Sequence, residues 1–410
     1  MIGGGAAGFF AAVAAARAAE AVQVVLFEAT AHPLAKVRIS GGGRCNVTHA
    51  CFDPRELIKR YPRGSRELLG PFHRFGPNET IEWFARHGVT LKTEADGRVF
   101  PATDDSATIV NCLCRQAASC GVELRTRCGV RNVRQAAAID PPAGNLSFVL
   151  ETTEGTVEEF DRVVVATGGN RGSTGLAIAA AFGHSIAPPV PSLFTFHLDD
   201  PRLQGLEGVS VSAAELSVPG TRLREAGAML VTHWGLSGPA VLRLSAWGAR
   251  ELASREYRFP LRVAWVGSRR LEHAAADLER LRGAHPRRQT NNINPWELPA
   301  RLWERLLAAA GVARDAPWTT ISNAALQVLA REAVAADYVV TGKSMNKEEF
   351  VTCGGVQLSQ VDFRRMESRL CRGLFFAGEV LDIDGITGGF NFQAAWTTGW
   401  IAGHAAASDG

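Results

Sequence analysis

Met1-Ile2-Gly3-Gly4-Gly5-Ala6-Ala7-Gly8 is the stretch that decides the fold of this 410-residue chain. Gly3, Gly5 and Gly8 have the spacing G-x-G-x-x-G. This spacing forms a tight turn between a strand and a helix and lets the backbone come close to a pyrophosphate. The strand that should precede the turn is reduced to Met1 and Ile2. The glycines therefore form either a phosphate-binding turn or a helix cap without a chemical role.

The residues that follow favour the phosphate-binding turn. Residues 6–21 are nearly all small or aliphatic, which is typical of a helix buried against a sheet. Residues 22–28 (VQVVLFE) are an apolar run, short enough for a buried parallel strand, that ends on Glu28. Glu28 stands 20 residues after Gly8, where a dinucleotide-binding unit places the carboxylate that accepts hydrogen bonds from a ribose. The pattern predicts a βαβ unit that binds a dinucleotide.

Composition limits the class of protein. The chain is 46% hydrophobic and 21% charged, which is typical of a globular protein, and its length suffices for two or three domains. A net charge of +3 gives no global reason to expect nucleic acid or a charged membrane surface as a partner. No apolar run is long enough to span a bilayer, and the first residues lack the pattern of a secretory signal. We therefore expect a cytoplasmic protein that binds no membrane.

The eight cysteines give no sign of a metal site or a disulfide framework. None forms a Cys-x-x-Cys pair, and no Cys/His group has zinc-ligand spacing. We expect reduced thiols and no metal, and the missing Cys-x-x-Cys argues against a disulfide-relay flavoenzyme.

A second glycine-rich loop lies at residues 36–48 (KVRISGGGRCNVT). Three consecutive glycines, Gly41–Gly43, expose backbone N–H groups, and Lys36, Arg38 and Arg44 add positive charge around them. This combination suits an anion. The alternative is a glycine-rich turn whose basic side chains are merely solvated.

The middle of the chain alternates between helical and strand-like patterns. Residues 162–169 (RVVVATGG) indicate a buried strand that leads into a turn of small residues. The other expected segments are a largely helical stretch over 78–121 with a helix at 107–119, short strands over 122–161, strand-like alternation over 195–266, and helices over 268–336.

The C-terminal part returns to a pattern suited to a nucleotide. An apolar strand ends in Gly378-Glu379, and Gly385, Gly388 and Gly389 precede a helix that begins at Phe390. A helix N-terminus preceded by glycines offers free N–H donors and the positive end of a dipole. In a flavoprotein, this end would face the edge of the ring that becomes negative on reduction.

These motifs, taken in order, resemble the NAD(P)/FAD-dependent oxidoreductases often labelled aminoacetone-oxidase-like, of which a bacterial bile-acid reductase is a distant member. The resemblance spans nearly the whole chain and rests on GGGAAG, KVRISGGGRCNVTH, ATGG, THWGLSGPA, FVTCGGV, MESRL, GLFFAGEVLDIDG and TGGFNFQAAWTTG. It implies an α/β fold: a Rossmann-like, glutathione-reductase-like FAD-binding domain over 1–190 and 350–410. An inserted β-rich domain would occupy 191–267 and 336–349, and a small helical subdomain 268–335.

The resemblance also implies which residues contact FAD. They are Gly3, Gly5, Ala6 and Gly8 at the pyrophosphate; Glu28 at the adenosine ribose; Lys36, Ser40, Gly41, Gly42, Gly43, Arg44, Cys45 and Asn46 along the pyrophosphate and ribityl chain; Val130 at the adenine; Thr167, Gly168 and Gly169 beside the cofactor; Gly378 and Glu379 at the ribityl hydroxyls; and Gly388, Gly389, Phe390 and Asn391 at the flavin ring.

The sequence offers two candidate catalytic residues. Cys45 lies in a basic loop that could lower the pKa of a thiol, and the alternative is a buried thiol that packs beside the cofactor. His233, in THWGLSGPA, is a candidate acid near the flavin, and the alternative is a packed or capping histidine.

Three functions stay open at this point. We expect an FAD-dependent oxidoreductase that acts on a small organic substrate or on oxygen, without nucleic acid. NAD(P)H would dock transiently, because the chain has only one complete dinucleotide motif and FAD uses it. The alternatives are a non-catalytic FAD-binding or redox-sensing protein and a flavin-dependent RNA-modifying enzyme. The oligomeric state is not predicted.

Overall fold

The chain forms two compact units, each described here by itself. The computed structural model describes residues 1–19, 21–136, 147–170, 172–344 and 351–408. The first unit consists of Met1–Pro191 with Lys347–Gly410, and the second of Ser192–Asn346. The domain boundaries expected from the sequence stay predictions, and the one at 349/350 lies outside the described residues. Among the described residues, no helix is long and apolar enough to cross a membrane.

The first unit is built on a sheet whose centre is a single residue, Ile2. Ile2 bridges Val165 and Phe27 in parallel. Its N–H donates to the Val164 carbonyl at 2.8 Å, and its carbonyl accepts from the Ala166 N–H at 2.8 Å. The resulting order is β5 (Glu123–Arg125), β1 (Val25–Phe27), Ile2, β9 (Val163–Val165), β21 (Leu374–Phe376), β20 (Glu367–Ser368) and β19 (Val361–Asp362). The expected short first strand is therefore present and fully paired.

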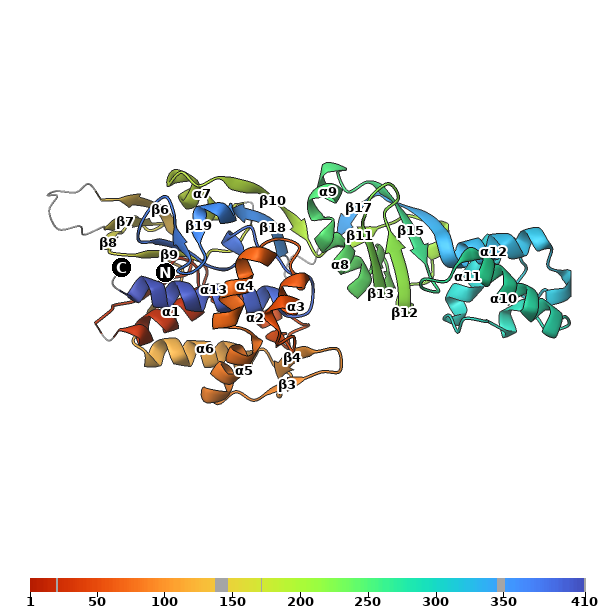
Figure 1. Cartoon of the computed structure of the whole chain (residues 1–410), viewed down its shortest axis with the longest axis horizontal. Helices are drawn as coiled ribbons and strands as arrows, with labels where there is room; N and C mark the ends of the chain where they lie inside the picture. Colours follow the sequence, from red (N-terminus) through yellow and green to blue (C-terminus); the bar gives the residue numbers. More distant parts are fainter. Residues whose placement is uncertain (20, 137–146, 171, 345–350, 409–410) are drawn as a thin grey trace. The chain divides into compact units, whose positions relative to one another are not determined.

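Two long helices from opposite ends of the sequence pack together in this unit. α1 (Ala6–Ala18) and α13 (Phe390–Ala407) lie side by side (Figure 1). A Cβ at Gly399 would lie 2.4 Å from the Ala7 carbonyl oxygen, and one at Gly403 would lie 2.2 Å from that of Ala11. Only hydrogen fits at these positions, so the two helix backbones can approach closely.

Shorter elements complete the first unit. α1 ends three residues before the predicted Ala21, because Ala19 has an extended backbone. The helix predicted at 107–119 is confirmed as α6 (Ala107–Ser119). The remaining elements are α2 (Ala35–Ile39), α3 (Pro54–Leu57), α4 (Ser65–Arg74), α5 (Pro77–Arg86) and α7 (Thr174–Ala181); the sheet β2 (Thr48–His49), β4 (Arg98–Pro101) and β3 (Leu91–Thr93); the sheet β6 (Val130–Gln135), β7 (Phe148–Thr152) and β8 (Val157–Phe160); and the pair β10 (Ile186–Ser192) and β18 (Val351–Val356).

The second unit has one antiparallel sheet and a group of helices. The sheet order is β16 (Ala336–Val340), β15 (Phe259–Ala264), β12 (Ser210–Ser217), β13 (Arg224–Thr232), β14 (Gly235–Ser237), β11 (Thr195–His197) and β17 (Gly342–Ser344). Figure 1 shows α10 (Leu271–Ala284), α11 (Ala300–Ala309) and α12 (Asn323–Ala335) gathered at one end of this unit. Sheet and helices share one hydrophobic core, in which Phe196 and Trp303 both lie.

The prediction of strand-like structure over 195–266 is wrong for residues 239–254. They form α8 (Pro239–Trp247) and α9 (Ala249–Ser254). Pro239 occupies the first helical turn, a position that requires no N–H. Ala240, Val241 and Leu244 are buried, and this spacing places them on one face of a helix.

Replacing Gly403 with alanine tests the close approach of α1 and α13. We expect Gly403→Ala to lower the free energy of unfolding by about 1–3 kcal/mol, the usual range for overpacking. At Gly283, in α10, a Cβ would meet no atom of the described residues within 4 Å apart from its chain neighbours. Gly283→Ala is the control and should raise stability by about 0.5–1 kcal/mol. Urea denaturation measures both. Equal stability of the two variants would contradict the proposed packing.

Candidate functional site

The first glycine turn is shaped by contacts within the chain. Gly3 has φ +107°, and a Cβ there would lie 2.5 Å from the Ala166 carbonyl oxygen. A Cβ at Gly8 would lie 1.9 Å from the Gly3 carbonyl oxygen. These two glycines therefore allow strand β9, the turn and helix α1 to approach one another. They are required by the turn itself, whatever ligand it binds.

The start of α1 has room for an anion. Gly5 caps the helix, and apart from its neighbours in the chain no atom of the described residues lies within 4 Å of where its Cβ would be. Within the described part of the chain, the N–H groups of Gly5, Ala6 and Ala7 have no hydrogen-bond acceptor. Three free donors at the positive end of a 13-residue helix fit a pyrophosphate.

Glu28 follows β1 and already holds the glycine turn. Its Oε2 accepts from the Gly4 N–H at 2.9 Å, and its Oε1 accepts from the N–H and hydroxyl of Thr30 at 2.8 and 2.7 Å. The Cys128 N–H donates to the Glu28 backbone carbonyl at 2.9 Å, which brings the start of β6, and with it Val130, close to Glu28. The predicted ribose and adenine contacts are thus neighbours in the structure.

The second glycine loop turns through four positions with left-handed backbone conformations. Gly41, Gly42, Gly43 and Cys45 all have positive φ. Apart from chain neighbours, no atom in the described part of the chain would lie within 4 Å of a Cβ at Gly42 or Gly43. The loop therefore exposes its backbone, as expected for a surface that a cofactor approaches.

The charge of Arg44 is neutralised within the protein. Its Nη1 donates to Glu94 at 2.6 Å and lies 3.4 Å from Asp104. Its guanidinium carbon lies 4.0 Å from the centre of the Phe100 ring. Arg44 thus connects the loop to β4 and its flanking turns. Its interactions with Glu94 and Asp104 compete with the predicted interaction between Arg44 and an anion.

Cys45 is a buried thiol. Its side chain is inaccessible to solvent. Burial raises the pKa of Cys45 to about 12, although a hydrogen bond with Ser40 opposes the increase. The thiol is therefore protonated at neutral pH. This environment supports the packing role over a nucleophilic or redox role.

An ion pair joins a segment near the start of the sequence to one near its end. Lys36 Nζ donates to Glu379 Oε2 at 2.7 Å, and the carboxylate is the more buried partner. Gly168 and Gly169 pack beside Glu379: a Cβ at Gly169 would lie 2.5 Å from the Glu379 carbonyl oxygen. The predicted contacts from the second loop, from β9 and from β21 therefore converge. The hydroxyl of Thr352 is buried there without a hydrogen-bond partner among the residues that the structure describes, and Thr352 lies against Gly169.

The start of α13 is hydrogen-bonded to the second glycine loop. The Asn46 side-chain amide is oriented so that both its oxygen and its nitrogen form hydrogen bonds. Its oxygen accepts from the Gly389 N–H at 3.0 Å, and its nitrogen donates to the Thr48 carbonyl at 3.0 Å. Asn391 makes two hydrogen bonds with the backbone of Gly385, at 2.8 and 2.9 Å. The four residues predicted at the flavin ring, Gly388–Asn391, are thus held in one rigid helix start.

Several residues that support this helix start were missed by the sequence analysis. Arg63 binds the fully buried carboxylate of Asp384 through two guanidinium nitrogens, and Tyr61 donates to the Phe390 carbonyl at 2.6 Å. The His49 ring stacks on Phe390 with centroids 4.8 Å apart, and burial lowers the pKa of His49. These partners come from segments more than 300 residues apart, so no local pattern indicates them.

His233 lies in the second unit, in the exposed turn between β13 and β14. Its role as an acid near the flavin stays a prediction.

Comparison with known proteins identifies the family. Residues 1–405 match the HI0933-like protein Rossmann domain. The chain is 32% identical to the ribosomal RNA dihydrouridine synthase of Escherichia coli (strain K12), over 98% of this chain and 95% of that protein. It is 29% identical to the 3-dehydro-bile acid delta(4,6)-reductase of Clostridium scindens, over 99% of this chain and 98% of that protein.

Solved structures confirm the fold. The chain is similar to the 3-ketosteroid-delta4-(5alpha)-dehydrogenase of Rhodococcus jostii RHA1, with a TM-score of 0.52 and 16% identity over 100% of this chain and 96% of that one. At this identity the likeness concerns the fold alone. Together with the family match, it confirms the Rossmann-like FAD-binding fold predicted from the sequence.

Glu28→Ala tests the nucleotide-binding end of the site. Hydrogen bonds to a charged group contribute about 1.5–3 kcal/mol, so FAD should bind roughly ten- to a hundredfold more weakly. Glu123→Ala is the control, since Glu123 is an exposed carboxylate on the neighbouring strand β5 and pairs with Arg125. The ratio of flavin to protein absorbance measures the occupancy. Full FAD content in Glu28→Ala would refute this assignment.

Cys45→Ala tests the packing role of the thiol. The variant should keep FAD and most flavin reduction. The pKa of about 12 in the folded chain exceeds the value of about 8.5 for an unfolded thiol, so burial of this thiol stabilises the fold below pH 8.5 and less at higher pH. Between pH 9 and 10, wild type should therefore lose about 1.2 kcal/mol more stability than Cys45→Ala, measured by urea denaturation. A loss of turnover by orders of magnitude with FAD still bound would instead make Cys45 catalytic.

Proposed function

Because this chain belongs to the HI0933-like family of Rossmann-domain proteins, we propose that it is an FAD-dependent reductase of a carbon–carbon double bond conjugated to a carbonyl group, with a uracil ring of RNA as its substrate. The observation that carries the proposal is the 32% identity to a ribosomal RNA dihydrouridine synthase over nearly the full length of both chains. A second such synthase, from Haemophilus influenzae, is 28% identical over 98% of this chain.

The names of the relatives support one reaction class. Forming dihydrouridine saturates the double bond of the uracil ring, which is conjugated to a ring carbonyl. A delta(4,6)-reductase of a 3-dehydro bile acid acts on double bonds conjugated to a ring ketone. In each case the substrate gains one hydride and one proton. The reaction class is therefore common to both relatives, and only the substrate differs.

The residues of the first unit are suited to hold the cofactor that this chemistry requires. FAD, when bound, would supply hydride transfer. The free N–H groups of Gly5, Ala6 and Ala7 would bind its pyrophosphate, and Glu28 would accept hydrogen bonds from its ribose. The N-terminus of α13 would direct its positive dipole toward the flavin ring.

Lys36 and Glu379 would adjust their ion pair when the cofactor binds. The Lys36 side chain is 43% exposed, so its ammonium can donate to a phosphate as well as to Glu379. The Glu379 carboxylate can accept from hydroxyl groups while it still accepts from Lys36. In this proposal both groups would lie where the ribityl chain and the pyrophosphate meet.

The reaction requires a source of hydride. A reductant of the NAD(P)H class would supply the two electrons, and the proton would come from water or from a titratable side chain. Transient docking of NAD(P)H, as the sequence suggests, stays part of the proposal.

A small cyclic enone is the second candidate substrate, favoured by the 29% identity to the bile-acid reductase. It corresponds to the small-molecule substrate, without nucleic acid, that the sequence analysis favoured. The short first strand favoured a non-catalytic protein, because an incomplete sheet would bind FAD poorly. Ile2 is fully paired with both neighbouring strands, so this reason no longer applies.

The function can be tested on the purified holoprotein with transcribed ribosomal RNA and either NADH or NADPH. We expect RNA-dependent oxidation of the reductant and a mass increase of two hydrogens in uridine, detected by nucleoside mass spectrometry. A parallel reaction with a cyclic 3-ketosteroid enone tests the second candidate. Turnover of the enone with unmodified RNA would overturn the RNA assignment, and no turnover of either would overturn the reaction class.

A further inference from the structure

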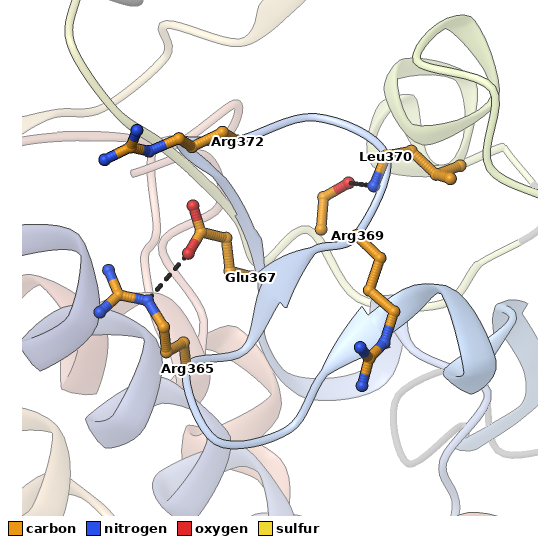
Figure 2. A pocket seen from close by; sticks show the side chains of 6 residues that line it. Arg365, Glu367, Arg369, Leu370 and Arg372 are labelled. Carbon is orange, nitrogen blue, oxygen red and sulfur yellow. Dashed lines mark hydrogen bonds and ion pairs between the residues drawn. The ribbon is translucent and has the colours of Figure 1, made fainter. Parts of the chain in front are cut away.

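An open pocket lies in the first unit at the turns that flank β20. Its volume is about 460 Å³. Figure 2 shows its lining, in which Arg365, Glu367 and Arg372 extend to one side of the hairpin and Arg369 and Leu370 to the other. Ser368 completes the lining.

The pocket carries net positive charge. Its one carboxylate, Glu367, accepts from Arg365 Nε at 2.9 Å and from the Gly373 N–H at 2.8 Å. Arg369 Nε donates to the Val361 carbonyl at 3.3 Å, and within the described residues neither Arg369 nor Arg372 forms an ion pair. Two guanidinium charges, those of Arg369 and Arg372, are therefore not balanced by any carboxylate that lines the pocket.

The turn that carries these arginines is preorganised. The Ser368 hydroxyl accepts from the N–H groups of Leu370 and Cys371, at 3.0 and 2.9 Å. The same hydroxyl lies 2.8 Å from Nε2 of His184, which is 4% exposed. The Leu370 side chain, held on this turn, is 52% exposed. One fixed turn thus carries both unbalanced guanidinium groups, with Arg369 beside the apolar Leu370 side chain on one side of the hairpin and Arg372 on the other (Figure 2).

The pocket is separate from the cofactor residues. Strand β21 follows the pocket, and Gly378 and Glu379 come after its carboxyl end. The residues expected to bind FAD therefore lie at the other end of this strand. From Arg372 to Gly378 the chain can span at most about 20 Å, so one RNA molecule is large enough to reach both sites.

We propose that this arginine pocket binds backbone phosphates of the RNA substrate and that Leu370 contacts a base or sugar beside them; the proposal rests on the proposed function. Guanidinium groups pair bidentately with phosphate oxygens, which gives both affinity and orientation. The pocket thereby anchors the RNA away from the flavin and leaves the reacting base free to enter the cofactor site. It adds affinity but no recognition of base sequence.

The experiment measures binding of a fluorescein-labelled ribosomal RNA fragment to the FAD-loaded protein by fluorescence anisotropy. We expect the double variant Arg369→Gln/Arg372→Gln to bind at least about tenfold more weakly near 100 mM KCl, with a salt slope smaller by about 1.4–1.8. Its FAD content and the reduction of its flavin by NAD(P)H should equal those of wild type. The control, Arg86→Gln/Arg115→Gln on α5 and α6, removes the same charge outside the pocket and should bind as wild type does.

Three outcomes would overturn the pocket assignment. In the first, the pocket variant binds RNA with the affinity of wild type. In the second, the control variant loses as much affinity for RNA as the pocket variant does. In the third, inorganic phosphate at about 1 mM displaces the RNA, which would indicate a site for a small anion. If wild type reduces RNA uridine while any of these holds, the pocket proposal fails and the function stands. If wild type neither binds nor reduces RNA, both fail.

Discussion

The architecture of the first unit depends on backbone approaches in which only a hydrogen atom fits between neighbouring segments. Gly3 and Gly8 bring strand β9 and helix α1 against the first turn, and Gly399 and Gly403 bring α13 against the same helix. At Gly378, whose φ is +72°, a Cβ would lie 2.8 Å from the Ala7 side chain, so the strand end that precedes Glu379 also packs on α1. The start and the end of the sequence are thereby brought together around one helix. The candidate site exists only because of that packing.

Electrostatics at the site follows from the same arrangement. The positive ends of α1 and α13 are the fixed charges, since helix dipoles need no side chain and their N–H groups cannot swing away. The side-chain charges are largely paired: Lys36 with Glu379, Arg44 with Glu94, and Arg63 with Asp384. The Arg63–Asp384 pair is the buried one, and removing either partner there would leave an unpaired buried charge. These pairs join the loops of the candidate site to neighbouring segments, and the donors proposed to face the cofactor are backbone N–H groups and Lys36.

Local sequence predicted the parts of the site that depend on local geometry. The glycine spacing, the carboxylate after β1 and the glycines before α13 each reflect a turn that few other residues can make, and the structure brings these residues together. The helix at 107–119 was predicted at its observed bounds because its apolar residues repeat with helical spacing. Residues 239–254 were misassigned because the surrounding strand pattern outweighed a short helical one.

What could not be predicted is the pairing of distant side chains. Arg63 with Asp384, and Tyr61 with Phe390, join segments whose spacing in sequence carries no signal. Arg44 was expected to face an anion because its neighbours are glycines and basic residues, whereas Glu94 and Asp104 reach it through the fold of β3 and β4. Likewise, the basic loop around Cys45 suggested a lowered thiol pKa, and burial has the opposite effect.

Titration of the deflavinated protein with FAD and, separately, with FMN tests the central claim most directly, because FMN lacks the adenosine half that the first turn and Glu28 are proposed to bind. The account predicts one FAD per chain and FMN binding weaker by at least about a hundredfold, which corresponds to about 2.7 kcal/mol. Equal affinities for FAD and FMN, or no binding of FAD, would contradict it.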